Sequence, residues 1–164
     1  MILRNSELWR FFIKEACNSS MAIVKFFCFL HVTRTYVLDV ASIPGPSMLP
    51  TLNITGNVVL VDRISPRFSK IAAGDIVIVG SPENPTKVIT KRLIGVEDDS
   101  ITYLVDPKHT EKCNTVVVPK GHMWVQGDNI YNSRDSREFG PVPYGLLYGK
   151  VFWRIWPMKD FGPL

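Results

Sequence analysis

A series of short apolar runs, each ended by turn-forming residues, constrains the fold of this chain most strongly. The runs are rich in valine, isoleucine and leucine and occupy residues 58–62, 75–79, 87–94, 101–105, 115–118, 123–126 and 146–155. Glycine, proline, asparagine and aspartate separate them, for example at Gly74, Pro82 and Gly121. Many short strands at this spacing are typical of a closed or two-layered antiparallel sheet. The sequence therefore predicts a mainly β domain, a compact antiparallel barrel or sandwich.

The segment before this region has a different character. Residues 21–42 are apolar at the density of a helix that meets a membrane, although Lys25, His31, Arg34 and Asp39 interrupt the run. A helix that crosses a membrane needs about 20 predominantly apolar residues, with few or no charged ones. The pattern favours a single membrane anchor over a helix docked at the interface, and both over a core helix of a soluble domain. No second segment of this kind follows in the sequence.

Prolines mark the boundary between the two regions. Pro44, Pro46 and Pro50 restrict their own φ angles and the residues before them, so this stretch cannot be helical. We therefore predict two parts, an N-terminal segment over residues 1–42 and a β domain over residues 43–164. A chain of 164 residues accommodates one such domain and a short appendage.

Charge and metal-binding residue types exclude several classes of function. Nineteen basic and fifteen acidic residues give a net charge of +4, and the basic residues are scattered, which argues against nucleic-acid binding. A mildly basic protein is compatible with an anionic membrane surface. The cysteines and histidines stand alone, without metal-ligand spacing, at Cys17, Cys28, Cys113, His31, His109 and His122. We predict no metal and no cofactor.

Two residues are candidates for nucleophilic chemistry. Ser47 lies in the proline-framed segment, where its side chain projects, although an isolated turn serine has the same pattern. Lys91 shares a strand face with Ile89 and Leu93, because successive side chains alternate, and Arg92 points the other way. If that face is buried, the pKa of the lysine falls and the amine can act as a base. The alternative is an edge-strand lysine with its amine in water.

A serine nucleophile needs a base to activate its hydroxyl group. The sequence has no Gly-x-Ser-x-Gly motif, and none of its histidines lies in a triad context. A Ser–Lys pair is the remaining arrangement. Residues 127–143, which are polar and rich in turn formers, indicate either a solvated loop or the wall of an active site.

Three motifs resemble the signature boxes of the type I signal peptidases, in the order of that family. They are Gly-Pro-Ser-Met-Leu-Pro-Thr at 45–51, Lys-Arg-Leu-Ile-Gly at 91–95, and Gly-Asp-Asn-x-x-x-Ser-x-Asp-Ser-Arg-x-x-Gly-Pro-Val at 127–142. The third box is long and highly specific, and the resemblance extends from about Gly45 to Pro157. Flanking details resemble the mitochondrial inner-membrane branch of the family, and the first of its two subunit types. These details lie at 121–124, 143–146, 155–157 and 160–162.

The resemblance implies a role for each matching residue. Ser47 matches the nucleophile, Lys91 the general base, and Ser133 the hydroxyl that orients the lysine amine. The remaining matches are structural and imply two ion pairs, Arg92–Asp128 and Asp135–Arg137. The fold implied is the β fold of signal peptidases with one N-terminal membrane-associated helix.

The chain departs from the family pattern at two places. Some bacterial relatives have a serine two residues before the nucleophile, whose hydroxyl donates to the oxyanion, whereas this chain has Gly45. The main-chain N–H of Ser47 would supply one donor, and a backbone group or water would have to supply the other. The family also often continues from the lysine box into Gly-x-Pro-Gly-Asp, whereas residues 95–99 are Gly-Val-Glu-Asp-Asp. We expect a changed loop there and an intact site.

The resemblance implies a membrane-bound serine endopeptidase that removes sorting presequences from proteins delivered to the mitochondrial intermembrane space. It implies presequence-bearing substrates, a second protease subunit in a heterodimer, and an inner-membrane location with the catalytic domain facing the intermembrane space. A catalytically silent partner subunit or presequence-binding module is the alternative, although such a module needs none of Ser47, Lys91 and Ser133. A Ser–Lys autoprotease of the repressor type would require a DNA-binding domain, for which residues 1–42 are too few and too apolar.

Overall fold

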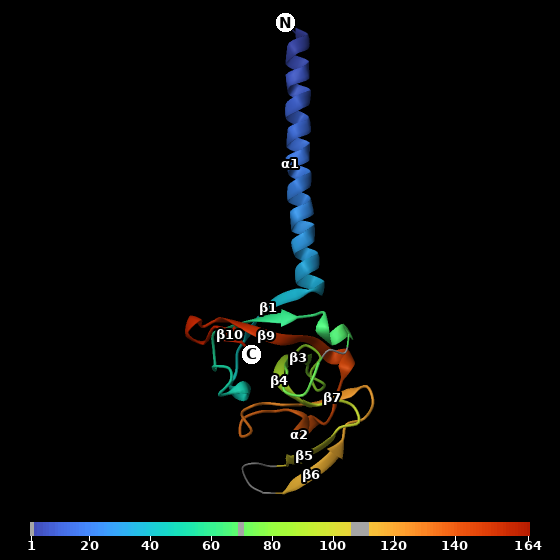
Figure 1. The fold of residues 1–164 in the computed structure, drawn as a ribbon, viewed down its shortest axis with the longest axis vertical. Helices are drawn as coiled ribbons and strands as arrows, with labels where there is room; N and C mark the ends of the chain where they lie inside the picture. The colour runs from blue at the N-terminus through green and yellow to red at the C-terminus, as the bar shows by residue number, and fades with distance from the viewer. Residues whose placement is uncertain (1, 69–70, 106–111) are drawn as a thin grey trace. The chain divides into compact units, whose positions relative to one another are not determined.

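The computed structural model describes residues 2–68, 71–105 and 112–164, with side chains from Trp9 onward. The chain divides into two units, one up to Val37 and one from Leu38 to Leu164. The first unit is a helix and the second contains every strand of the described residues (Figure 1).

Helix α1 (Ile2–Tyr36) is one continuous helix of 35 residues. Within it, Trp9–Tyr36 is long and apolar enough to cross a membrane, judged by length and composition. At about 1.5 Å per residue this stretch is longer than the roughly 30 Å hydrocarbon core of a bilayer. Its large apolar side chains are exposed, including Phe26, Phe27 and Phe29. The prediction of one N-terminal apolar helix is confirmed.

The helix ends earlier than the apolar pattern indicated, because residues 38–43 form a strand. Strand β1 (Leu38–Ile43) pairs antiparallel with β2 (Asn57–Asp62) along its whole length. This ladder satisfies the backbone hydrogen bonds of β1, which places these residues with the β unit. The boundary between the units therefore lies after Val37, whereas the sequence pattern placed it after residue 42.

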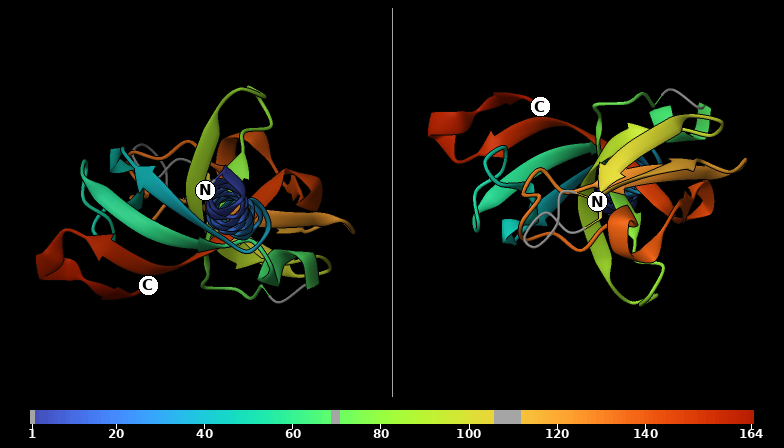
Figure 2. Two further views of the ribbon diagram at one scale, coloured as in Figure 1. Left: turned by 90° about the horizontal axis from the view of Figure 1, so that it is seen from above. Right: turned by 90° about the horizontal axis from the view of Figure 1, so that it is seen from below.

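The predicted apolar runs are all strands in the structure, within one or two residues at each end. Antiparallel pairing orders the main sheet β1-β2-β9-β3-β4-β7-β8, with β10 paired to β9 (Figures 1 and 2). The further strands are β3 (Ile76–Gly80), β4 (Val88–Gly95), β5 (Ser100–Leu104), β6 (Cys113–Val117), β7 (His122–Gln126), β8 (Val142–Pro143), β9 (Leu147–Trp156) and β10 (Gly162–Pro163). Strands β5 and β6 form a separate hairpin. The mainly β, antiparallel fold class is thus confirmed.

Short helical turns complete the β unit. They are α2 (Ser136–Phe139), η1 (Pro46–Met48), η2 (Ser65–Phe68), η3 (Tyr144–Leu146) and η4 (Met158–Asp160). The loop after β4, which departs from the family pattern, closes with Asp98 at a φ of 67°. Aspartate is among the residues that tolerate this left-handed conformation.

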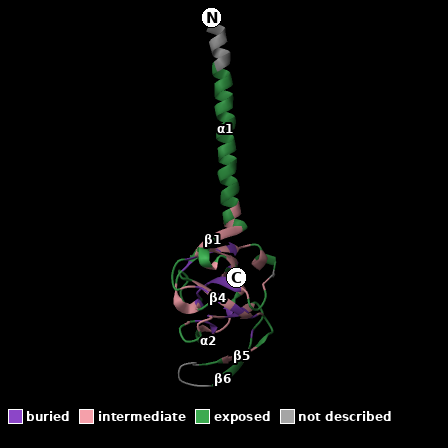
Figure 3. Ribbon diagram, turned by 60° about the vertical axis from the view of Figure 1, so that its left-hand side comes forward, coloured by how far each residue is buried: buried purple, intermediate pink, exposed green. Residues whose placement is uncertain are grey.

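The sheet curls around two apolar clusters that share β3 as a wall. All five residues of β3 are buried. Figure 3 shows the buried residues within the β unit, whereas the described part of α1 is almost entirely exposed. Because side chains alternate, Ile76 and Ile78 pack in one cluster while Val77 and Val79 pack in the other. Irregular register between β2 and β9 bends the sheet and increases its twist.

Strands β1 and β4 each leave one edge open. Strand β1 pairs only with β2, among the described strands. Strand β4 pairs with β3 from Val88 to Arg92, whereas β7 covers β4 only from Arg92 to Gly95. The edge of residues 88–91 is therefore not covered by β7, and these two edges position the site.

Candidate active site

Ser47 projects from a constrained turn directly after β1. Pro46 begins η1, and Met48 anchors the turn in the core with 1% of its surface exposed. Gly45 has a φ of 123°, a conformation that disfavours residues with a side chain. Glycine adopts this conformation readily because it has no Cβ atom, and it has no hydroxyl group that could donate to an oxyanion. Ser47 itself is half-buried.

The third box holds this turn from the other side. Asn129 donates from its backbone N–H to the carbonyl oxygen of Ser47 at 3.0 Å and from its side-chain amide to that of Pro46 at 3.1 Å. Gly127 makes the close approach possible. A Cβ atom on Gly127 would lie 2.1 Å from Ser133 Oγ and 2.5 Å from the Ser47 carbonyl oxygen. Neither contact is sterically permitted.

Lys91 is buried, with 3% of its surface exposed. It pairs across the sheet with Val77 and shares its strand face with Ile89 and Leu93, so apolar groups surround its stem. Burial lowers the pKa of Lys91 from 10.5 to about 8, a change that the charge of Asp135 opposes. The structure thus decides between the two interpretations of the sequence in favour of a desolvated lysine.

A chain of hydrogen bonds fixes the lysine amine. Lys91 Nζ donates to Ser133 Oγ at 3.0 Å, and Ser133 Oγ donates to Asp135 Oδ2 at 2.7 Å. Asp135 is fully buried and accepts from the Gly127 N–H at 2.9 Å. Arg137 donates to both carboxylate oxygens of Asp135 at 2.8 Å, which is the first of the two expected ion pairs. Burial works against ionisation of Asp135, but these hydrogen bonds hold its pKa below the ordinary value.

The second expected ion pair links three parts of the site. Arg92 donates from Nε and Nη2 to the two carboxylate oxygens of Asp128, both at 2.7 Å. Arg92 Nη1 also donates to the carbonyl oxygen of Gly74 at 2.7 Å. Thr51 Oγ1 donates to Asp128 Oδ2 at 2.5 Å, so the serine box, the lysine strand and the third box are joined.

Ser47 and Lys91 line the same cleft. Its volume is about 460 Å³, and its walls are residues 41–48, residues 87–91, Ile78, Asn132 and Arg134. Residues of β1 and of the open edge of β4 thus line one cavity together with the serine and the lysine. All the residues predicted for the site from the sequence surround this cleft or support it.

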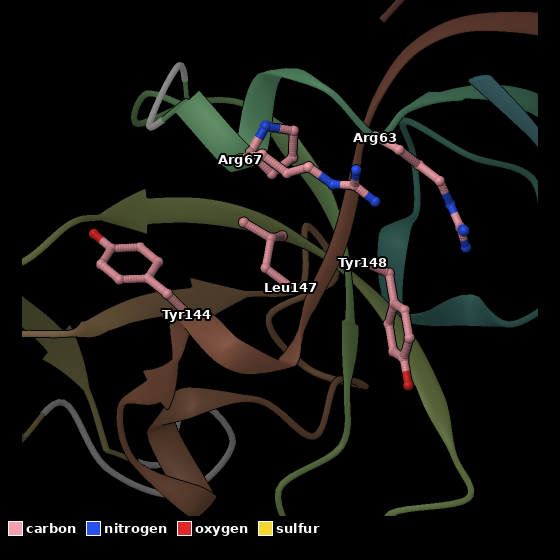
Figure 4. Close-up of a pocket in the computed structure, with 6 residues that line it drawn as sticks. Arg63, Arg67, Tyr144, Leu147 and Tyr148 are labelled. Carbon is pink, nitrogen blue, oxygen red and sulfur yellow. The ribbon is translucent and has the colours of Figure 1, made fainter. Parts of the chain in front are cut away.

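A second pocket lies away from the serine and the lysine. It has a volume of about 310 Å³ and a basic and aromatic lining that includes Arg63 and Arg67. Figure 4 shows Leu147 between Tyr144 and Tyr148, with the side chain of Arg67 crossing above it.

A third cavity, of about 280 Å³, shares lining residues with both the cleft and the second pocket. It shares Ala41, Ile78 and Val88 with the cleft, and Arg63 and Tyr148 with the second pocket. The three cavities form a series that leads away from Ser47.

Three supporting residues were not identified from the sequence, namely Thr51, Gly127 and Asn129. Each lies inside a quoted motif, but only the folded distances show that it joins one motif to another. No group of three or more His, Cys, Asp or Glu side chains in the described part of the chain is arranged to hold a metal ion.

Comparison with known proteins identifies the family. Residues 16–108 and 104–156 match the profile of the family described as signal peptidase, peptidase S26. Mitochondrial ATP-independent inner membrane protease subunit 1b of Arabidopsis thaliana is 53% identical over 160 residues, which cover 98% of this chain and 95% of that protein. The chain belongs to the peptidase S26 family.

Other members have related names. Mitochondrial inner membrane protease subunit 1 of Homo sapiens is 43% identical over 85% of this chain and 82% of its own length. Mitochondrial inner membrane protease subunit 2 of Danio rerio is 45% identical over 80% of this chain and 73% of its own length. The crystal structure of a signal peptidase I from Enterococcus faecalis V583 aligns with 49% of this chain and 96% of that chain, at 26% identity and a TM-score of 0.43. The chain is therefore a peptidase of the signal peptidase family.

Proposed function

We propose that this S26 peptidase is a membrane-attached serine endopeptidase in which Ser47 is the nucleophile and Lys91 the general base. The observation that carries the proposal is the buried amine of Lys91, whose pKa is lowered to about 8, in the cleft that Ser47 lines. A lysine in water keeps its proton at neutral pH and cannot accept another, whereas a desolvated lysine can lose it.

The reaction follows from this pair. Neutral Lys91 Nζ accepts the hydroxyl proton of Ser47 as Oγ attacks the scissile carbonyl carbon, and the Ser47 N–H donates to the oxyanion. When the peptide C–N bond breaks, Lys91 returns the proton to the leaving amine and an ester remains on Ser47. Lys91 then takes a proton from water, the resulting hydroxide attacks the ester, and the proton returns to Ser47 Oγ.

The surrounding residues position the base. Ser133 accepts a hydrogen bond from the lysine amine, and Asp135 fixes the Ser133 hydroxyl. Arg137 neutralises Asp135 through its ion pair. The ion pair of Arg92 with Asp128 holds the Ser47 turn through Thr51. These residues act through Lys91 and Ser47 and take no part in bond cleavage.

The substrate binds as an extended segment beside the open strand edges. Strands β1 and β4 run in the same direction in the alternating order of the sheet; Ser47 follows the end of β1, and Lys91 lies within β4 where its uncovered edge ends. A peptide lying in the cleft can pair its backbone with the free N–H and C=O groups of either edge, as in β-strand addition. The apolar lining at Ile43, Ile78 and Ile89 then receives alternate side chains.

Helix α1 and the names of the relatives support a membrane attachment and a partner subunit. We assign α1 as a single anchor in the mitochondrial inner membrane, with the β unit in the intermembrane space, where it removes sorting presequences. The relatives named mitochondrial inner membrane protease subunit 1 and subunit 2 support the inner membrane and a heterodimer with a second subunit. Protease protection in mitochondria with opened outer membranes tests the sidedness.

The test of the dyad uses the full chain, with its partner subunit, and a presequence-bearing substrate. Ser47→Ala and Lys91→Met are each expected to lower cleavage by at least about 100-fold. Ser100→Ala and Lys120→Met make the same chemical changes at exposed positions and are expected to retain activity. Cleavage at the wild-type rate by either cleft variant refutes the dyad.

A further inference from the structure

The ionisable side chains that line the catalytic cleft are all basic. Lys87, Lys91 and Arg134 contribute to its walls, and no described aspartate or glutamate does so. A positive charge without a partner in a substrate cleft attracts an anionic group of the bound molecule. Whether the cleft has such a charge depends on the partner of each basic residue.

Two of the three positive charges are offset within the protein. Arg134 Nη2 lies 2.5 Å from Glu83 Oε1, and Arg134 Nε lies 3.5 Å from Glu138 Oε2. The Lys91 amine is linked to the Asp135 carboxylate through Ser133. Arg134 and Lys91 are thus each already linked to a carboxylate of the protein.

Lys87 has a charge without a partner at a position that the backbone fixes. Its side chain is exposed, and it makes no ion pair with a carboxylate of the described residues. The Lys87 N–H donates to the carbonyl oxygen of Asn84 at 3.0 Å, and the Lys87 carbonyl oxygen accepts from the Ser81 N–H at 2.8 Å. These bonds close the hairpin between β3 and β4, so Lys87 continues the ladder of β4.

Lys87 lines the same cleft as the proposed base Lys91, and the strand fixes the spacing between the two residues. Lys87, Ile89 and Lys91 alternate onto one face of the strand. Four residues of a strand span about 13 Å. The positive charge of Lys87 acts on the Lys91 amine and helps to lower its pKa. A peptide extended beside β4 therefore places a side chain near Lys87 about four residues from the bond held at Ser47.

We propose that Lys87 is a specificity-determining residue, which selects an aspartate or glutamate about four residues from the scissile bond of the substrate. This inference rests on the proposed function, because the position is counted from a bond cleaved at Ser47. The ion pair formed is exposed to solvent, so the preference is modest, about threefold, and it weakens as salt is added.

The test is a positional scan of peptide substrates with the full-length protein in detergent. One aspartate is moved through each position on both sides of the scissile bond, and an asparagine peptide is the reference at each position. We expect kcat/KM to favour aspartate about threefold at one position, about four residues from the bond. Lys87→Met abolishes this preference and Lys87→Glu reverses it towards a lysine peptide, whereas Lys120→Met retains it.

A binding measurement separates this inference from the proposed function. Ser47→Ala protein, with or without Lys87→Glu, is titrated with the same labelled peptides, and fluorescence anisotropy gives Kd without turnover. Equal Kd values for aspartate and asparagine peptides at every position overturn the role of Lys87 and leave the dyad intact. So does an acidic preference that survives Lys87→Glu. Undiminished cleavage by the Ser47→Ala protein instead overturns the proposed function.

Discussion

Replacing Lys91 by methionine is expected to stabilise the folded protein at neutral pH while it abolishes cleavage. The fold lowers the pKa of Lys91 from 10.5 to about 8, mainly by burial. One pKa unit corresponds to about 1.4 kcal/mol, so holding the proton on the buried amine costs about 3 kcal/mol of folding free energy. Methionine fills a similar volume without charge, but it loses the hydrogen bond to Ser133, worth about 1 kcal/mol. The expected net gain is about 2 kcal/mol.

This gain has a defined pH window. Between the folded pKa of about 8 and the ordinary value of 10.5, the unfolded chain binds more protons at Lys91 than the folded chain does. The free energy of unfolding of the wild-type protein therefore rises with pH across this interval. The advantage of Lys91→Met is complete below the folded pKa and is lost as the pH rises to 10.5.

Urea unfolding of the full chain in detergent measures this difference. Tryptophan fluorescence, to which Trp124 buried against Tyr103 contributes, reports on the core of the β unit. Wild type, Lys91→Met and Lys120→Met are compared at neutral pH and above 10.5. Lys120 is exposed, so its variant is expected to match the wild type. Two results would show that burial does not destabilise the charged form of Lys91. One is a Lys91→Met protein less stable than the wild type at neutral pH. The other is a stability difference between the two proteins that is the same at both pH values.

Three further substitutions test the supporting contacts. Gly127→Ala places a Cβ atom against Ser133 and the Ser47 carbonyl oxygen. We therefore expect the free energy of unfolding to fall by about 1–3 kcal/mol and cleavage to be lost. The control Gly145→Ala, whose Cβ atom has open space around it, is expected to be tolerated. Arg137→Met leaves the fully buried Asp135 without its cation and lowers the urea midpoint by an amount equivalent to about 3–5 kcal/mol; an unchanged midpoint contradicts the role of this pair. Ser133→Ala frees the lysine amine and lowers kcat at least about tenfold with little change in KM; an effect on KM alone contradicts the positioning role.

The sequence predicted most strands because their signals are local. The runs of β-branched residues and the turn residues between them specify β2 to β7 and β9 without reference to distant parts of the chain. Strand β1 was missed because Leu38–Ile43 continues the apolar helix without glycine or proline, and only pairing with β2 makes it a strand. Strands β8 and β10 span two residues each, too few for a periodic pattern.

The sequence motifs predicted which residues lie together in the site, but not the contacts and the burial that define it. Alternation along β4 correctly placed Arg92 on the face opposite Lys91, where it pairs with Asp128. The burial of Lys91 depends on Val77 across the sheet, which no local pattern encodes. The catalytic roles of Ser47, Lys91 and Ser133 stay predictions, carried by family resemblance and by the geometry of the cleft.

The pH dependence of kcat/KM shows whether Lys91 acts as the general base, because kcat/KM reports the ionisation of the free enzyme. Lys91 must be neutral to accept the Ser47 proton, so activity rises with pH through the pKa of Lys91. The groups that act on that pKa besides burial are Asp135 and Asp128, which raise it, and Lys87 and Arg137, which lower it.

We expect an acidic limb of the pH profile with an apparent pKa near 8, below which kcat/KM falls about tenfold per pH unit. An acidic limb near the ordinary lysine value of 10.5, or a profile that is flat through pH 8, contradicts it.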